Sequence, residues 1–309
     1  RKNREIYDDI ELENHPLLKL VFAPKNLSKI VIHEDCFSIG QSVLTDMNEL
    51  ESIEYSQGIT NYITRFPYFN PITTHKQQLR HIKVSGEYCQ LTPKVFENMK
   101  HLEIFEISPI TKLYYIPESA FSGCENLISV NIPSTCYSIE SRSFKNCIKL
   151  TKIEIHTNTE YECTNVSPLT FIHKESFYNC QSLEEITIPS TIFAIGESAF
   201  MNCIKLKRIQ IGNEKETRKQ DTLKYIEKNA FRNCKSLETF ILPSTCIFLG
   251  VCSFMDCINL KSFVCSGIDL QAIQCRTFYN CKSLVNFKLN VKSEITQKIS
   301  NITNNITEK

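Results

Sequence analysis

The chain of 309 residues carries 35 Lys+Arg against 34 Asp+Glu, and 42% of its residues are hydrophobic. A formal net charge of +1 argues against nucleic acid or anionic lipid as a partner, because proteins that bind these polyanions carry a clear basic excess. The hydrophobic fraction is sufficient for a continuous core. No apolar run approaches the roughly 18 residues that cross a bilayer. We therefore expect no nucleic-acid partner and no membrane insertion within this chain.

Residues 1–26 contain no repeat, but they carry five apolar side chains that could cover a first strand: Ile10, Leu12, Leu17, Leu18 and Leu20. We expect this segment to form an N-terminal cap. At the other end, isoleucines spaced by four, three and four residues indicate an amphipathic helix, namely Ile295, Ile299, Ile302 and Ile306. We expect residues 291–309 to be a C-terminal cap helix or a tail.

Between these ends the sequence repeats. Seven of the 15 cysteines follow one another at spacings of 23, 33, 23, 31, 23 and 24 residues: Cys124, Cys147, Cys180, Cys203, Cys234, Cys257 and Cys281. We call these the lattice cysteines. The same frame recurs with methionine at Met47 and Met99, and two degenerate units keep only their second halves. A recurring unit of this length predicts a solenoid, here with eleven strand segments across residues 27–290.

Each unit has two halves with different periods. The second half alternates apolar and polar residues, as in Ile186-Thr187-Ile188, which predicts a short strand. The first half places Ala199 and Phe200 one helical turn before Cys203, which predicts a short helical turn. Neither half can bury a core alone, so the units must stack with their strands parallel.

The segment IPSTIFAIGESAFMNCIKLKRIQI, residues 188–211, and the equivalent units resemble the BspA-like, or treponemal-type, leucine-rich repeats. This resemblance covers roughly residues 17–290. It implies an α/β solenoid, a leucine-rich repeat horseshoe with a parallel sheet on its concave side and helical turns on its convex side. The family is typical of surface-exposed proteins of bacteria and parasitic protists. One departure is that the glycine before the helical turn occurs only at Gly40, Gly196 and Gly250.

The lattice cysteines are too regularly spaced to converge on one metal ion, and the chain lacks a C-x2-C pair. We expect them to be buried free thiols. Any disulfide would involve the cysteines that lie outside regular columns: Cys89, Cys163, Cys252 and Cys275. The seven histidines show no metal-binding spacing, and nucleophile, phosphate and dinucleotide motifs are missing. We therefore expect no catalytic residues, no metal site, no cofactor and no enzyme activity.

The outward middle position of each strand forms a column: Val31, Glu54, Lys83, Glu106, Asn131, Glu154, Thr187, Gln210, Ile241, Val264 and Lys288. Opposite charges alternate in its first half. In its second half, Ile241 and Val264 are predicted neighbours on a polar face. They form either a contact patch or two β-branched residues chosen for strand propensity.

Three insertions follow directly after strands and so lie on one edge, at about residues 56–78, 156–171 and 212–223. Such insertions commonly carry specificity in repeat proteins. The first contains the aromatic residues Tyr62, Phe66, Tyr68 and Phe69, and the second contains Tyr161. The aromatic insertion is a candidate contact surface. Alternatively, its rings fold back over the degenerate unit beside it.

These features together predict a non-catalytic recognition or adhesion module that binds a protein or glycan ligand through the concave face and edge loops. Such a module would be secreted or lie at the cell surface. The alternative is a cytoplasmic scaffold or regulatory subunit that uses the same surfaces, because a series of reduced thiols fits a reducing compartment.

Overall fold

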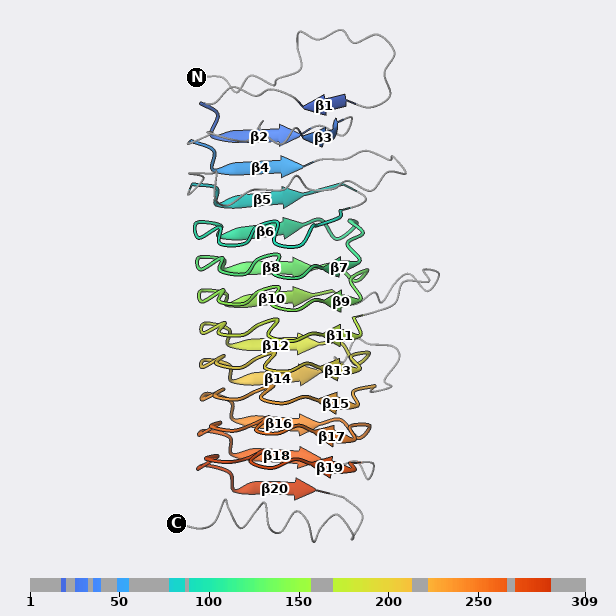
Figure 1. The fold of residues 1–309 in the computed structure, drawn as a ribbon, viewed down its shortest axis with the longest axis vertical. Coiled ribbons are helices and arrows are strands. Elements are labelled where there is room, and N and C mark those ends of the chain that lie inside the picture. Colours follow the sequence, from blue (N-terminus) through green and yellow to red (C-terminus); the bar gives the residue numbers. More distant parts are fainter. Residues whose placement is uncertain are drawn as a thin grey trace.

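The computed structural model describes residues 18–20, 26–32, 36–39, 49–55, 78–86, 89–156, 169–212, 222–265 and 270–289. In these residues the chain winds as a solenoid whose turns stack along its long axis (Figure 1). All strand pairs are parallel and equivalent positions lie side by side, as for Ile53, Ile82 and Phe105. The predicted parallel-sheet solenoid is confirmed.

Four-residue strands form one stack, which we call the long-strand face. These strands are β2 (Lys29–Ile32), β4 (Ser52–Tyr55), β5 (His81–Val84), β6 (Ile104–Ile107), β8 (Ser129–Ile132), β10 (Lys152–Ile155), β12 (Glu185–Ile188), β14 (Arg208–Ile211), β16 (Thr239–Leu242), β18 (Ser262–Cys265) and β20 (Asn286–Leu289). Burial alternates along most of these strands, as in the exposed and buried pattern of β6 and β16, so one side of these strands faces the core.

A second stack, which the sequence analysis did not predict, runs beside the first (Figure 1). We call it the short-strand sheet. Its two-residue strands pair in one seven-stranded parallel sheet: β7 (Tyr115–Ile116), β9 (Ser138–Ile139), β11 (Phe171–Ile172), β13 (Ala194–Ile195), β15 (Tyr225–Ile226), β17 (Phe248–Leu249) and β19 (Ala272–Ile273). Near the N-terminus, β1 (Leu18–Leu20) pairs with β3 (Cys36–Ile39).

The predicted helical turns are not observed in any part of the chain that the structure describes. The segment between each short strand and the next long strand forms successive turns instead. Two residues in each of these segments have a positive φ, for example Arg142 at 60° and Asn146 at 62°. A right-handed helix cannot pass through such residues. Asparagine tolerates this conformation better than most residues, which explains why it recurs directly before the lattice cysteines.

Glycine has a steric role before these turns. Neither Gly196 nor Gly250 is among the residues with positive φ. A Cβ atom on Gly250 would lie 2.5 Å from the carbonyl carbon of Glu227, and one on Gly196 would lie 2.8 Å from that of His173. These two positions therefore require glycine because the backbone of the preceding turn lies too close for a side chain.

The core is a column of stacked rings. Phe121, Phe144, Phe177, Phe200 and Phe231 are fully buried, and successive ring centroids lie 5.1 to 5.4 Å apart. The interplanar angles within this series are 15° or less. Each ring covers the face of the ring in the next turn, so the turns bury one another's apolar surface.

The lattice cysteines lie beside this column as buried free thiols, as the sequence predicts. The Sγ of Cys203 donates a hydrogen bond to the carbonyl oxygen of Phe177 in the preceding turn, at 3.2 Å. The same oxygen accepts the backbone N–H of Cys180. All seven lattice thiols make the equivalent bond, at 3.0 to 3.2 Å. Each thiol therefore links two turns in addition to filling space.

The long-strand face is divided at two positions. Its strands form one sheet from β2 to β10, a pair β12–β14, and a sheet of β16, β18 and β20. The divisions follow β10 and β14, the strands that precede the second and third predicted insertions. Ile155 and Ile211, which end these strands, are only partly buried, whereas Ile188 is fully buried. The short-strand sheet and the phenylalanine column continue past both divisions.

We expect Gly250→Ala to lower the free energy of unfolding by about 1–3 kcal/mol, the usual range for an overpacked site. The new Cβ meets backbone atoms of Glu227 and Lys228 at 2.5 Å, which cannot move aside as a flexible side chain could. Urea unfolding followed by circular dichroism measures the change. Glu227→Ala is the matched control, because this residue holds the same place in the neighbouring turn and already has a Cβ. Equal midpoints for the two variants would contradict the steric role of Gly250.

The lattice thiols make stability depend on pH. Burial raises the pKa of the Cys203 thiol from 9.0 to about 12, so the folded chain holds this proton more tightly than the unfolded chain does. The stabilisation that comes from this tightly held proton is complete below pH 9, and it is lost as the pH rises toward 12. The slope is about 1.4 kcal/mol per pH unit for each such thiol.

We therefore expect the urea midpoint to fall steeply between pH 9 and pH 11. Cys203→Ala should make this dependence shallower, because one proton fewer is released on unfolding. Cys275→Ala, which removes an exposed thiol, should leave the dependence unchanged. A Cys203→Ala chain with the same pH dependence as the parent would show that the lattice thiol is not the responsible group.

Candidate ligand-binding surfaces

Two of the predicted contact residues lie in the described part of the chain. Ile241 of β16 and Val264 of β18 are paired in register, and so are Thr239 and Ser262. Ile241 is 71% exposed, and Val264 is partly exposed. Lys288 follows Val264 in the same column. The structure thus places a small apolar pair on an otherwise polar part of the long-strand face.

The remaining predicted contact residues lie outside the described residues. These are Tyr62, Phe66, Tyr68 and Phe69 of the first insertion and Tyr161 of the second. Their assignment as contact residues stays a prediction. Most residues of the two predicted caps, 1–26 and 291–309, also lie outside the described residues, so both caps stay predictions.

The N-terminal half of the long-strand face carries ion pairs between neighbouring strands. Glu54 lies 3.1 Å from the ammonium groups of both Lys29 and Lys83. Hydrogen bonds from Lys29 and then Lys83 hold the pKa of the Glu54 carboxyl below its ordinary value. His81 lies 3.5 Å from Glu106. Because the side chains in these pairs are partly exposed, each pair contributes little to stability, and the region is a solvated arrangement of opposite charges.

Asn131 interrupts this pattern. Its side-chain oxygen accepts the backbone N–H of Ile107 at 2.8 Å, and its side-chain amide donates to the Ile107 carbonyl. The in-register pairs between β6 and β8 include Ile104 with Ser129 and Phe105 with Val130, and extend no further. The Asn131 side chain therefore replaces ladder hydrogen bonds where the two strands separate.

A second candidate surface, which the sequence analysis missed, lies on the short-strand sheet. We call it the aromatic row, and it consists of Tyr115, Tyr137, Phe171, Phe193, Tyr225 and Phe248. Ring centroids lie 6.2 Å apart for Tyr115 and Tyr137. They lie 5.8, 5.5 and 6.4 Å apart along the series from Phe171 to Phe248. Tyr137, Phe171 and Phe193 are 36 to 41% exposed, so this row of rings faces solvent.

Each ring of the row stands at one of two adjacent positions, either the first residue of a short strand or the residue directly before it. Where the ring stands before the short strand, as at Phe193, the strand begins with a small residue, here Ala194. Where the strand begins with the ring, as at Tyr225, the residue before it is not aromatic, except in the first turn of the row, where Tyr114 precedes Tyr115. The sequence does contain this signal, because each ring lies nine or ten positions before a lattice cysteine.

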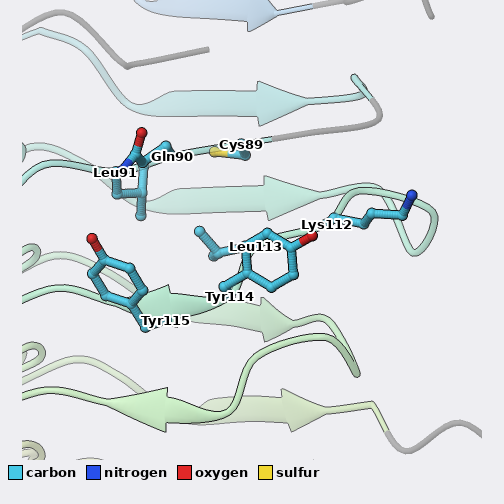
Figure 2. Close-up of a pocket in the computed structure, with 7 residues that line it drawn as sticks. All are labelled: Cys89, Gln90, Leu91, Lys112, Leu113, Tyr114 and Tyr115. Carbon is cyan, nitrogen blue, oxygen red and sulfur yellow. The ribbon is translucent and has the colours of Figure 1, made fainter. Parts of the chain in front are cut away.

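A shallow recess opens at the first turn of the row. Figure 2 shows the residues that line it, with Tyr114 and Tyr115 from one turn and Cys89, Gln90 and Leu91 from the turn before. Lys112 also lines it. Tyr114 is 38% exposed. The N-terminal end of the row therefore offers two rings and several polar groups.

The thirteen cysteines whose side chains the structure describes are free. Cys89 and Cys252 are buried and free, and Cys275 is exposed and free. Burial raises the pKa of Cys89 to about 12, which suppresses its reactivity. Cys163 lies outside the described residues. In the described part of the chain, no three His, Cys, Asp or Glu side chains gather as they would around a metal ion.

None of the described residues forms a helix long and apolar enough to cross a membrane.

No curated protein matches the chain. Similar solved structures include a leucine-rich repeat protein from Bacteroides ovatus, which is 18% identical with a TM-score of 0.41 over 94% of this chain and 87% of that one. The leucine-rich repeat protein of T. pallidum is 17% identical with a TM-score of 0.43 over 84% and 90%. The pneumococcal vaccine antigen PcpA is 16% identical with a TM-score of 0.47 over 90% and 74%.

The family comparison extends over nearly the whole chain. The model of the BspA type leucine-rich repeat region matches in six copies, over residues 17–76, 74–167, 161–222 and 213–308. The matched segments include both stacks of strands and the phenylalanine column described above. The chain therefore belongs to the BspA-type leucine-rich repeat family.

Proposed function

We propose that the chain is a non-catalytic recognition or adhesion module that binds a protein or glycan ligand at a cell surface. The observation that carries this proposal is the apolar pair Ile241 and Val264, paired in register on the long-strand face. An isoleucine 71% exposed contributes nothing to the core. On a recognition surface, however, it supplies apolar area that a partner can bury.

We propose that the three predicted insertions add to this surface. Aromatic side chains such as Tyr62, Phe66, Tyr68 and Phe69 provide large contact area at a small loss of conformational entropy. All three insertions follow long strands, so a ligand on the long-strand face could reach them. We propose that these four residues and Tyr161 contribute to the contact.

A cytoplasmic scaffold or regulatory subunit is the second candidate. The observation that favours it is the set of free thiols, with thirteen cysteines free among the described residues. Disulfides are rare in the cytosol and frequent in secreted proteins. Peptide mapping of natively purified chain separates the candidates, since several native disulfides would exclude the cytoplasmic one.

The recognition function predicts that Ile241→Ser combined with Val264→Ser weakens binding about tenfold and leaves the melting curve unchanged, because neither side chain packs in the core. Binding is measured on an array of glycans and immobilised matrix polypeptides. Val31→Ser is the matched control, a 50% exposed β-branched residue in the same column beside Glu54.

A second variant replaces Tyr62, Phe66, Tyr68 and Phe69 by serine and should also weaken binding. Undiminished binding by both variants would mean that the contact surface lies elsewhere. Turnover of any compound on a broad substrate panel would contradict the non-catalytic assignment.

A further inference from the structure

We propose that the aromatic row binds a linear, acidic glycan. This inference rests on the recognition function proposed above, but it assigns a ligand class and a different surface, the short-strand sheet. Three features of the described residues support it: the shape of the row, the polar groups that its tyrosines carry, and one cation that lies within it.

The shape of the row fits a linear ligand. Phe171, Phe193, Tyr225 and Phe248 come from four successive turns, and each ring contacts the next. The row is one ring wide, whereas a protein partner usually buries a compact cluster of anchors surrounded by a rim. Sugar rings present C–H groups that stack on the electron-rich faces of aromatic rings. A linear glycan repeats such faces along its length, as the row repeats its rings.

The rings also carry polar atoms. Tyr115, Tyr137 and Tyr225 each combine an apolar ring with a hydroxyl group that can donate and accept hydrogen bonds. His173 adds an imidazole whose ring lies 5.6 Å from that of Phe171. A ligand with apolar faces and hydroxyl-bearing edges, such as a glycan, can use both kinds of group at once.

The charge within the row selects an acidic ligand. The two residue positions that form the row, from Tyr114–Tyr115 to Ile247–Phe248, contain one charged side chain, Lys224, and no acidic one. The flanking position that holds His173 also holds Glu140 and Glu227, and the Glu140 carboxylate lies 3.8 Å from the His173 ring. In the described part of the chain Lys224 makes no ion pair. It stands directly before Tyr225 and donates its backbone N–H to the carbonyl of Phe193. An ammonium group on the residue next to a ring of the row complements a carboxylate that repeats along a glycan.

The test uses the whole chain and a panel of linear uronate oligomers: oligogalacturonate, alginate oligomers and hyaluronan oligomers. Each is paired with its methyl ester, which keeps the backbone and removes the charge. Fluorescence polarisation of end-labelled oligomers measures affinity. We expect at least one uronate to bind, and we expect its ester to bind more weakly.

Phe193→Ala should weaken binding about tenfold, as removal of a stacking ring does elsewhere, and Phe193→Tyr should retain it. Lys224→Gln should weaken uronate binding about threefold, as expected for one exposed ion pair, and leave ester binding unchanged. Tyr279→Ala is the matched control, because this ring is 50% exposed but lies outside the row. Thermal melts of every variant distinguish lost binding from lost folding.

Several results would overturn the proposal. They are the binding of no uronate, uronate binding that survives Phe193→Ala, and equal affinity for uronates and esters. Preferential binding of a proline-rich peptide to the row would assign it to an extended polypeptide instead. If the uronates fail while the chain binds another ligand through Ile241 and Val264, this inference fails and the recognition function stands.

Discussion

Each turn of this solenoid is too short to bury its own apolar side chains, and this constraint governs the rest of the structure. Phe177, for example, has one face against Phe144 and the other against Phe200. Its carbonyl oxygen is shared in the same way, between the N–H of Cys180 in its own turn and the thiol of Cys203 in the next. Stability is therefore a property of neighbouring pairs of turns, and a change at one position is felt mainly by the two turns beside it.

Stacking also converts repetition along the chain into rows across the surface. A residue type that recurs at one frame position becomes a continuous line of side chains. The phenylalanine column and the aromatic row are such lines, one inside and one outside. The long-strand face differs because its outward residues vary from turn to turn, from the ion pairs around Glu54 to the apolar pair at Ile241. The two exposed surfaces therefore differ in kind, because the row repeats from turn to turn and the long-strand face does not.

The sequence predicted the features that arise from period and burial. The stacked parallel strands, the buried thiols and the neighbouring positions of Ile241 and Val264 all follow from one frame of about 23 residues. The prediction of helical turns was wrong. Phe200 and Cys203 have helical spacing, but Ser198, which precedes Phe200, and Asn202, which lies between the two, adopt positive φ. Spacing alone does not reveal this. The short strands were missed because two residues are too few to show a period of two, and the aromatic row was missed with them.

The two divisions of the long-strand face have a consequence for how the solenoid opens. Between β10 and β12, and between β14 and β16, the turns are held by the short-strand sheet and the phenylalanine column but not by a ladder of long strands. Backbone hydrogen bonds contribute to the resistance of each junction to separation. These two junctions are therefore the weaker points in the stack of long strands. Under thermal fluctuation or mechanical load we expect the long strands to separate first at these two points, while the short-strand sheet and the phenylalanine column still join the turns.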